Sequence, residues 1–249
     1  MPKIVYLDNL PAQEGVSILE NQNKIKVVKI ESNNLEQSFK ELETAHAFQV
    51  SAARDEVPKI FHVNEEFLSK TPNLILVSSG GAGYDTIDVE ACTKRGILVV
   101  NQTGGNAEAV AEHAVALMLD LLKRVTETDL LLRKGWSGAR EDFIGRNLFK
   151  KTVGLIGLGN TGGRVAEICQ NGFSCDILAY DPYISNERFS KFNAKKTNLD
   201  ELLFKSDIVS VHIPLTKETH NFIDKNFYSK MKKGSLFICL LYTSDAADD

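Results

Sequence analysis

The sequence contains few cysteines and no long apolar run. Its four cysteines form neither the C-x-x-C pairs of zinc and redox sites nor a spacing typical of disulfide frameworks. The longest apolar stretch, residues 114–122, is interrupted by Asp120 and is too short to span a bilayer. The first residues also lack the charged and apolar segments of a signal peptide. These absences favour a protein of the reducing cytoplasm that does not enter a membrane.

An excess of charge of one sign is missing as well. The formal net charge is -4, charged residues make up 25% of the chain, and no block of Lys or Arg stands out. Neither a nucleic acid nor an anionic membrane is therefore an expected partner. The 249 residues are 43% hydrophobic, which is enough to give each of two domains its own core. The expected partner is a small molecule.

Short runs rich in Ile and Val alternate with amphipathic stretches along the chain, a pattern typical of parallel sheets covered by helices. We expect a small α/β domain at residues 1–101 and a second at 102–238, joined by one long helix from Ala107 to Arg133 that Gly135 ends. The predicted strands are 4–7, 26–30, 48–51, 74–78, 98–100, 152–156, 177–180, 208–212 and 235–238, and the other predicted helices are 11–20, 35–44, 64–69, 86–94, 163–170 and 199–204.

The last eleven residues, CLLYTSDAADD, depart from this pattern. Residue for residue, they match one reading frame of a transposase adapter that is used to prepare sequencing libraries. We therefore expect residues 239–249 to be an adapter-derived tail and the fold to end at Ile238.

A glycine motif, Gly157-x-Gly159-x-x-Gly162, follows the first predicted strand of the second domain and opens a helix. In dinucleotide-binding proteins the first glycine makes a tight turn, the second lets the pyrophosphate approach the backbone, and the third lets the helix pack closely. The amides of Asn160 and Thr161 would point at the phosphates from the helix N-terminus. The alternative is a set of ordinary turn glycines.

The next predicted strand ends in Asp181, about 20 residues after the motif, where dinucleotide-binding domains place the acid that binds the ribose. A carboxylate there would accept hydrogen bonds from both ribose hydroxyls and would repel a 2′-phosphate. Pro182 and Tyr183 supply no Arg that would compensate. NAD is therefore the expected cofactor rather than NADP, unless Asp181 is merely a surface aspartate.

In this chain a predicted Rossmann unit follows a complete smaller α/β domain. Four sequence segments accompany this layout, namely 81–88 (GAGYDTID), 110–116 (VAEHAVA), 153–159 (VGLIGLG) and 211–216 (VHIPLT). Together they resemble the D-isomer-specific 2-hydroxyacid dehydrogenase family over residues 1–238. The resemblance implies a two-domain α/β fold, with a flavodoxin-like substrate domain and a Rossmann NAD-binding domain that is incomplete here. It also implies reversible hydride transfer between NADH and a small 2-oxo acid in a cleft between the domains.

The resemblance assigns the substrate to the loop 79–83. The free amides of Gly81, Ala82 and Gly83 would hold the substrate carboxylate, although a plain strand-to-helix turn would carry the same residues. Arg54 would face the cleft and pair with a carboxylate, or would simply be solvated.

On the cofactor side, Ile213 and Pro214 occupy the positions where the family lines the adenosine moiety, or they matter only for the shape of the loop. His113 and His212 titrate in a range useful for acid–base chemistry, but neither lies at the family's catalytic histidine. We interpret both histidines as structural.

The resemblance also limits the chemistry. The phosphoglycerate branch of the family has arginines where this chain has Ser51 and Ser79, and a substrate phosphate needs such cations, so a phosphorylated substrate is not expected. The family's substrate-orienting Arg, its acid and its proton-donating His all follow the position of Ile238. No catalytic residue is therefore expected within this chain, which we expect to be an inactive fragment. Two other readings stay open, a dinucleotide-sensing corepressor and an amino-acid dehydrogenase.

The resemblance implies a homodimer, and the helix predicted at 107–133 agrees with it. Val110, Val115 and Leu119 lie off the main apolar face of this helix and would need cover. We expect the helix to take part in the dimer interface.

Overall fold

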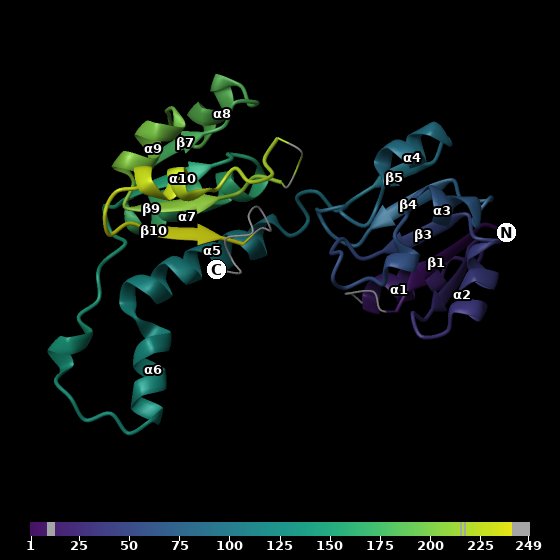
Figure 1. Cartoon of the computed structure of the whole chain (residues 1–249), viewed down its shortest axis with the longest axis horizontal. Coiled ribbons are helices and arrows are strands. Elements are labelled where there is room, and N and C mark those ends of the chain that lie inside the picture. The colour runs from purple at the N-terminus through teal and green to yellow at the C-terminus, as the bar shows by residue number, and fades with distance from the viewer. Residues whose placement is uncertain (9–12, 215, 217, 241–249) are drawn as a thin grey trace. The chain divides into compact units, whose positions relative to one another are not determined.

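The computed structural model of the chain describes residues 1–8, 13–214, 216 and 218–240 (Figure 1). It divides into two compact units, the first ending at Asn106 and the second beginning at Ala107. The division falls slightly later than the expected boundary after residue 101. Each unit has its own parallel five-stranded sheet, so the predicted two-domain α/β class is confirmed.

The first unit alternates strands with helices. Its strands are β1 (Lys3–Leu7), β2 (Lys26–Ile30), β3 (Ala47–Val50), β4 (Leu76–Ser79) and β5 (Leu98–Val100), and its helices are α1 (Gln13–Glu20), α2 (Leu35–Leu42), α3 (Glu65–Ser69) and α4 (Val89–Lys94). The strand order β2-β1-β3-β4-β5 is the flavodoxin-like order. Buried Phe48 stacks on Phe67 with ring centroids 5.2 Å apart, and such aromatic contacts fill the space between sheet and helices.

Helix starts in this unit are set by local side chains. Asn34, Asn64 and Asp88 each accept a hydrogen bond from the amide three residues further along, which satisfies a donor that the helix itself leaves free. The cap at Asp88 also explains why α4 begins at Val89 and not at Thr86 as predicted.

The second unit is doubly wound. Its strands are β6 (Thr152–Ile156), β7 (Asp176–Tyr180), β8 (Lys195–Lys196), β9 (Ile208–Val211) and β10 (Leu236–Cys239), and its helices are α5 (Ala107–Lys123), α6 (Val125–Arg133), α7 (Asn160–Phe173), α8 (Asn186–Lys191), α9 (Leu199–Lys205) and α10 (Lys225–Lys230). The strand order is β10-β9-β6-β7-β8, so the chain reverses direction across the sheet between β6 and β9. Open α/β sheets bind ligands at the carboxyl ends of strands at such a reversal.

The core of the second unit lies on both faces of its sheet. All four residues of β9 and the last four of β6 are buried, as expected for strands covered on both sides. One face packs against α5 and α7, around Met118 and Val165, and the other packs against α9 and α10, around Leu202 and Phe227. Figure 1 shows these helices around the sheet.

The predicted single helix from Ala107 to Arg133 is wrong, because the structure has two helices, α5 and α6. They meet at Arg124, whose backbone is left-handed with φ at 57°. The carbonyl of Leu122 accepts a hydrogen bond from the Arg146 amide at 2.7 Å. This bond from a distant segment replaces the one that the Leu122 carbonyl would accept from an amide of the next helical turn. A contact distant in sequence therefore ends the helix, and the apolar periodicity continues across the break.

The end of α6 agrees with the prediction. Gly135 has φ at +78°, and the Trp136 amide bonds back to the Leu131 carbonyl at 3.0 Å, which is the hydrogen-bond pattern of a glycine-terminated helix. Val115, which we placed off the main apolar face, is buried in the core that α5 forms with α7, and Leu119 is half-buried against the same core. Val110 is half-buried. The exposed apolar side chains of this region are Leu121, Val125, Leu130 and Leu132.

The boundaries of several other elements also differ from the predictions. Helix α7 is longer at both ends, and α8, β8 and α10 were not predicted because they are short and mostly polar. Strand β10 includes Cys239, which pairs with Val211, so the fold extends one residue into the tail that we excluded. Residues 241–249 lie outside the described residues. Among the helices of the described residues, none is both long and apolar enough to cross a membrane.

Candidate functional site

Two positions in the turn between β6 and α7 have no room for any residue other than glycine, and a third glycine faces free space. Gly157 has φ at +89°, and a Cβ there would lie 2.6 Å from the carbonyl oxygen of His212. A Cβ on Gly162 would lie 2.1 Å from the carbonyl oxygen of Gly157. At Gly159, by contrast, a Cβ would meet nothing within 4 Å. Packing therefore requires the first and third glycines, and the second faces free space into which a phosphate would fit.

The N-terminus of α7 presents backbone donors beside that space. The first bond of the helix runs from the Gly163 amide to the Gly159 carbonyl at 3.0 Å. Within the described part of the chain, the amides of Asn160 and Thr161 have no hydrogen-bond acceptor. Two free amides at a helix N-terminus favour a negatively charged group, so this arrangement fits the pyrophosphate of a dinucleotide.

Asp181 lies directly after β7 and is fixed over the same turn. Its Oδ2 accepts a hydrogen bond from the Leu158 amide and its Oδ1 accepts one from the Tyr183 amide, both at 3.0 Å. Each carboxylate oxygen keeps a second lone pair. The carboxylate is therefore held in one orientation and can still accept hydrogen bonds from the hydroxyls of a ribose.

The structure brings Arg188, which the sequence analysis did not consider, to the same turn. Its Nε donates to the Leu158 carbonyl at 2.9 Å and its Nη2 to Asn160 Oδ1 at 3.4 Å. Arg188 lies seven residues beyond Asp181, outside its immediate sequence neighbours, and α8, which carries Arg188, was not predicted. The short polar stretch 186–191 after the acidic residue was the available signal.

The strand β9 contributes the other side of the turn. Burial lowers the pKa of His212 to about 4, so its imidazole is neutral near pH 7, with Nε2 2.9 Å from Ser210 Oγ. Ile213 is half-buried beside Gly157, and the exposed Pro214 accepts a hydrogen bond from Thr219 Oγ1 at 2.7 Å. His113 is exposed on α5. These observations favour the structural interpretation of His212.

In the first unit, the carbonyls of the loop after β4 accept hydrogen bonds from neighbouring residues. Ser79 Oγ donates to the Gly83 carbonyl at 2.5 Å, Asn101 Nδ2 to the Ala82 carbonyl at 2.7 Å, and the Gln102 amide to the Gly81 carbonyl at 2.9 Å. The amides of Gly81, Ala82 and Gly83 donate to no acceptor among the described residues. The loop thus offers a set of free donors that fits a carboxylate.

Arg54 follows β3 and so lies at the same carboxyl end of the first sheet as the loop after β4. Its Nε donates to the Asp85 carbonyl at 2.8 Å, and the side chain is exposed. A Cβ on Gly81 would lie 3.1 Å from the Cβ of Ala52, so the loops after β3 and β4 adjoin. The hydroxyl of Ser51 is hydrogen-bonded to the carboxylate of Glu56, and like that of Ser79 it is already engaged.

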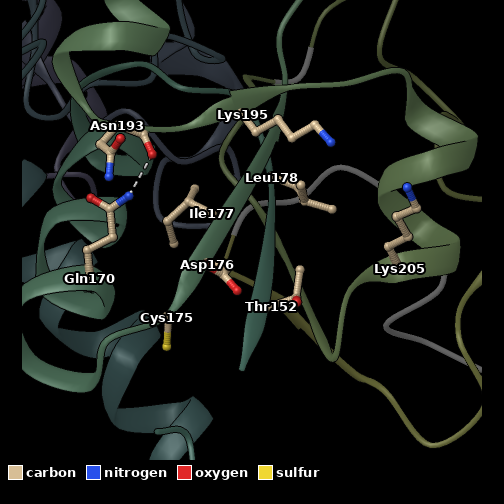
Figure 2. Close-up of a pocket in the computed structure, with 9 residues that line it drawn as sticks. All are labelled: Thr152, Gln170, Cys175, Asp176, Ile177, Leu178, Asn193, Lys195 and Lys205. Carbon is tan, nitrogen blue, oxygen red and sulfur yellow. Dashed lines mark hydrogen bonds between the residues drawn. The ribbon is translucent and has the colours of Figure 1, made fainter. Parts of the chain in front are cut away.

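A pocket of about 400 Å³ lies at the opposite end of the second sheet (Figure 2). It is lined by Thr152 and Asp176, the first residues of β6 and β7, and by Lys195 and Lys205. The glycine turn and Asp181 lie at the carboxyl ends of these strands. The pocket is therefore separate from the candidate cofactor site.

Comparison with known proteins places these features in a family context. Residues 115–240 match the family described as D-isomer specific 2-hydroxyacid dehydrogenase, NAD binding domain. The chain is 41% identical to D-3-phosphoglycerate dehydrogenase of Archaeoglobus fulgidus over 177 residues, which cover 71% of this chain and 33% of that protein. It is 38% identical to glyoxylate reductase of Thermofilum pendens over 187 residues, 71% of this chain and 53% of that protein.

A solved structure gives the same result over the whole chain. The D-lactate dehydrogenase from Aquifex aeolicus, complexed with NAD and lactic acid, superposes with a TM-score of 0.81 at 30% identity. The match covers 98% of this chain and 71% of that chain. The chain spans between 30% and 43% of the length of the curated D-3-phosphoglycerate dehydrogenases that it matches.

Proposed function

The chain belongs to the D-isomer specific 2-hydroxyacid dehydrogenase family, and from that premise we propose that its second unit binds NAD and that the whole protein reduces a small 2-oxo acid to a D-2-hydroxy acid. The observation that carries the proposal is the fixed carboxylate of Asp181 beside the open space at Gly159. A carboxylate and a glycine turn in this relation bind the ribose and pyrophosphate of a dinucleotide.

Each part of the turn has a separate task in this proposal. The amides of Asn160 and Thr161 hold the phosphates, and Asp181 accepts hydrogen bonds from the ribose hydroxyls. Ile213 and Pro214 line the adenosine side. Bound NADH supplies the hydride. The described residues of the turn contribute position and charge. His212 is not in its imidazolium form near pH 7, so we do not assign it the role of general acid.

For the substrate, we propose a small acid without a phosphate. The free amides of Gly81, Ala82 and Gly83 would bind its carboxylate, with Arg54 as a second partner. Although D-3-phosphoglycerate dehydrogenases are among the similar proteins, the hydroxyls of Ser51 and Ser79 are bonded to protein atoms and supply no positive charge.

We also propose that the 249-residue chain binds the cofactor without turnover. By resemblance, the Arg that orients the 2-oxo acid, the proton-donating His and its acid follow the position of Ile238. Losing a general acid alone reduces a rate by about two to four orders of magnitude. Assays of the 249-residue chain with NADH and glyoxylate, hydroxypyruvate or pyruvate would test this. Turnover of any of these acids by the chain would contradict the proposal, and NADH binding without turnover would support it.

The experiment for the cofactor is a fluorescence titration of the full chain with NADH and NADPH. We expect tighter binding of NADH, because Asp181 pairs with the ribose hydroxyls and repels a 2′-phosphate. The Asp181→Ala variant should lose most of this preference. Equal or tighter binding of NADPH by the unmodified chain would show that the assignment of Asp181 is wrong.

We propose a homodimer that uses α5 and α6. Helix α6 has no buried residue, and Leu130 and Leu132 are exposed on it by 51% and 65%. Exposed apolar side chains on a helix that buries none of its residues favour an interface. Light scattering at micromolar concentration should give the mass of two chains, and a monomer would refute the proposal.

A further inference from the structure

A carboxylate and a guanidinium lie on the two sides of one residue of the glycine turn. The Leu158 amide donates to Asp181 Oδ2 at 3.0 Å, and the Leu158 carbonyl accepts from Arg188 Nε at 2.9 Å. Among the described residues, the hydrogen-bond partners of Asp181 are the Leu158 and Tyr183 amides, and those of Arg188 are the Leu158 carbonyl and Asn160, so the two side chains do not pair with each other. Each group is thus anchored to Leu158 separately, and the two charges stay available at the place proposed for the ribose.

Arg188 is held in position by more than this bond. Its guanidinium carbon lies 5.3 Å from the centroid of the Phe192 ring, and Phe192 is buried against α7, where a Cβ on Gly163 would lie 2.3 Å from the ring. Its Nη2 also reaches Asn160 Oδ1. A guanidinium that is stacked on a ring and bonded through Nε has little freedom to lose when it binds a ligand.

Part of the guanidinium remains unused. Nε and Nη2 have partners, while Nη1 donates to no acceptor among the described residues. The planar arrangement of these donors matches the oxygens of a phosphate group. Next to the ribose-binding acid, such a group would be the 2′-phosphate of NADP.

We propose that Arg188 is a second determinant of cofactor choice, a preformed binding group for a ribose 2′-phosphate whose effect is masked by Asp181. This rests on the proposed dinucleotide site. With both residues present, the carboxylate repels the 2′-phosphate and NADH is preferred. Once the carboxylate is removed, Arg188 is already in place to bind NADPH, so this single substitution should remove the preference of the site for NADH.

The test measures dissociation constants of NADH and NADPH for the full chain and for Asp181→Ala, Arg188→Gln and the double variant. We expect Asp181→Ala to bind NADPH at least as tightly as NADH. Adding Arg188→Gln should then weaken NADPH binding by about 10- to 100-fold, which is the change in affinity expected for the loss of one hydrogen bond to a charged group. NADH binding should change much less. Circular dichroism checks that each variant folds.

Lys191→Gln is the matched control, because it removes a positive charge from the same helix. Lys191 is exposed, and its Nζ lies 5.3 Å from the same Phe192 ring. It should leave the ratio of the two affinities unchanged. Arg188→Lys keeps the charge without the planar donors and should retain part of the NADPH binding.

Several results would overturn the assignment of Arg188. Equal losses of NADH and NADPH would show that Arg188 only supports the turn, and the same selective loss in Lys191→Gln would show a general effect of charge. Equal binding of both cofactors by the unmodified chain would contradict the NAD preference and the masking by Asp181, and a selective loss of NADPH binding in Arg188→Gln would still support Arg188 as the group that binds the 2′-phosphate. If the unmodified chain bound neither cofactor, both proposals would fail.

Discussion

The two units each place a glycine-rich loop between a strand and a helix, and the loops differ in what holds them. In the second unit, backbone carbonyls lie so close to Gly157 and Gly162 that neither position has room for a methyl group. In the first unit, a Cβ on Gly83 would make only an ordinary contact, 3.7 Å from Ala52. The first loop is held by hydrogen bonds from its neighbours, such as the one from Asn101. Glycine is thus a steric requirement in one loop, whereas at Gly83 packing leaves room for a side chain.

The largest expected effect breaks the second loop. Gly162→Ala places a methyl group 2.1 Å from the Gly157 carbonyl oxygen, so α7 must move away from β6. We expect the free energy of unfolding to fall by about 1–3 kcal/mol or more. Urea denaturation followed by circular dichroism measures it.

The control for that variant is Gly83→Ala in the first loop, which should change the free energy of unfolding by less than about 0.5 kcal/mol. If the two substitutions had equal costs, the contrast between the loops would be lost.

The next effect separates packing from binding within the second loop. Gly159→Ala adds a methyl group where nothing lies within 4 Å, so the free energy of unfolding should stay within about 0.5 kcal/mol of the original. The methyl group would occupy the space proposed for the pyrophosphate and weaken NADH binding by about tenfold or more. Unchanged NADH affinity would place the phosphates elsewhere.

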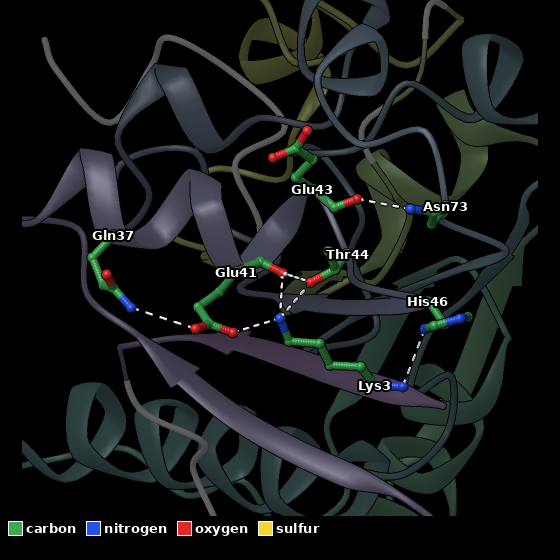
Figure 3. Close-up of polar contacts among 7 residues, drawn as sticks. All are labelled: Lys3, Gln37, Glu41, Glu43, Thr44, His46 and Asn73. Atoms are coloured by element: carbon green, nitrogen blue, oxygen red, sulfur yellow. Dashed lines mark hydrogen bonds and ion pairs between the residues drawn. The ribbon is translucent and has the colours of Figure 1, made fainter. Parts of the chain in front are cut away.

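The smallest effect concerns the first unit at the amino end of its strand β1, whereas the glycine-rich loop follows the carboxyl end of β4 (Figure 3). There Lys3 at the start of β1 forms an ion pair with Glu41, and its Nζ donates to the Glu41 carbonyl at 2.7 Å and to Thr44 Oγ1 at 2.8 Å. The hydrogen bond from Lys3 lowers the pKa of Glu41. This contact joins the start of β1 to the end of α2, at the end of the sheet opposite the glycine-rich loop.

Because the folded pKa of Glu41 lies below its unfolded value, the ion pair stabilises the fold above the unfolded pKa of about 4.3 and is lost as the pH falls through the folded pKa. Glu41→Gln should cost up to about 1 kcal/mol at pH 7 and less at pH 3, as thermal melting at both pH values would show. Glu66→Gln removes an exposed ion pair with Lys70 and should have a smaller effect at pH 7. If Glu41→Gln and Glu66→Gln changed the stability at pH 7 equally, the ion pair of Lys3 would stabilise the fold no more than an exposed ion pair does.

Local signals in the sequence were sufficient for the central parts of the fold. Strands β2, β5 and β6 have the predicted bounds, because short runs of Val and Ile determine them. The glycine motif and Asp181 were found by spacing alone, since the turn, the helix start and the next strand follow one another directly in the chain. Their geometry needs no contact with a distant segment other than neighbouring strands.

Only the tertiary structure decided the features that depend on distant contacts. The helix breaks at Arg124 because the Arg146 amide bonds to the Leu122 carbonyl, and Val115 is buried because α5 packs against α7. Arg188 reaches Leu158 across 30 positions of the sequence. A periodic pattern reports which residues are apolar, but it does not report which distant group satisfies a particular carbonyl, so these positions could be found only once the chain was folded.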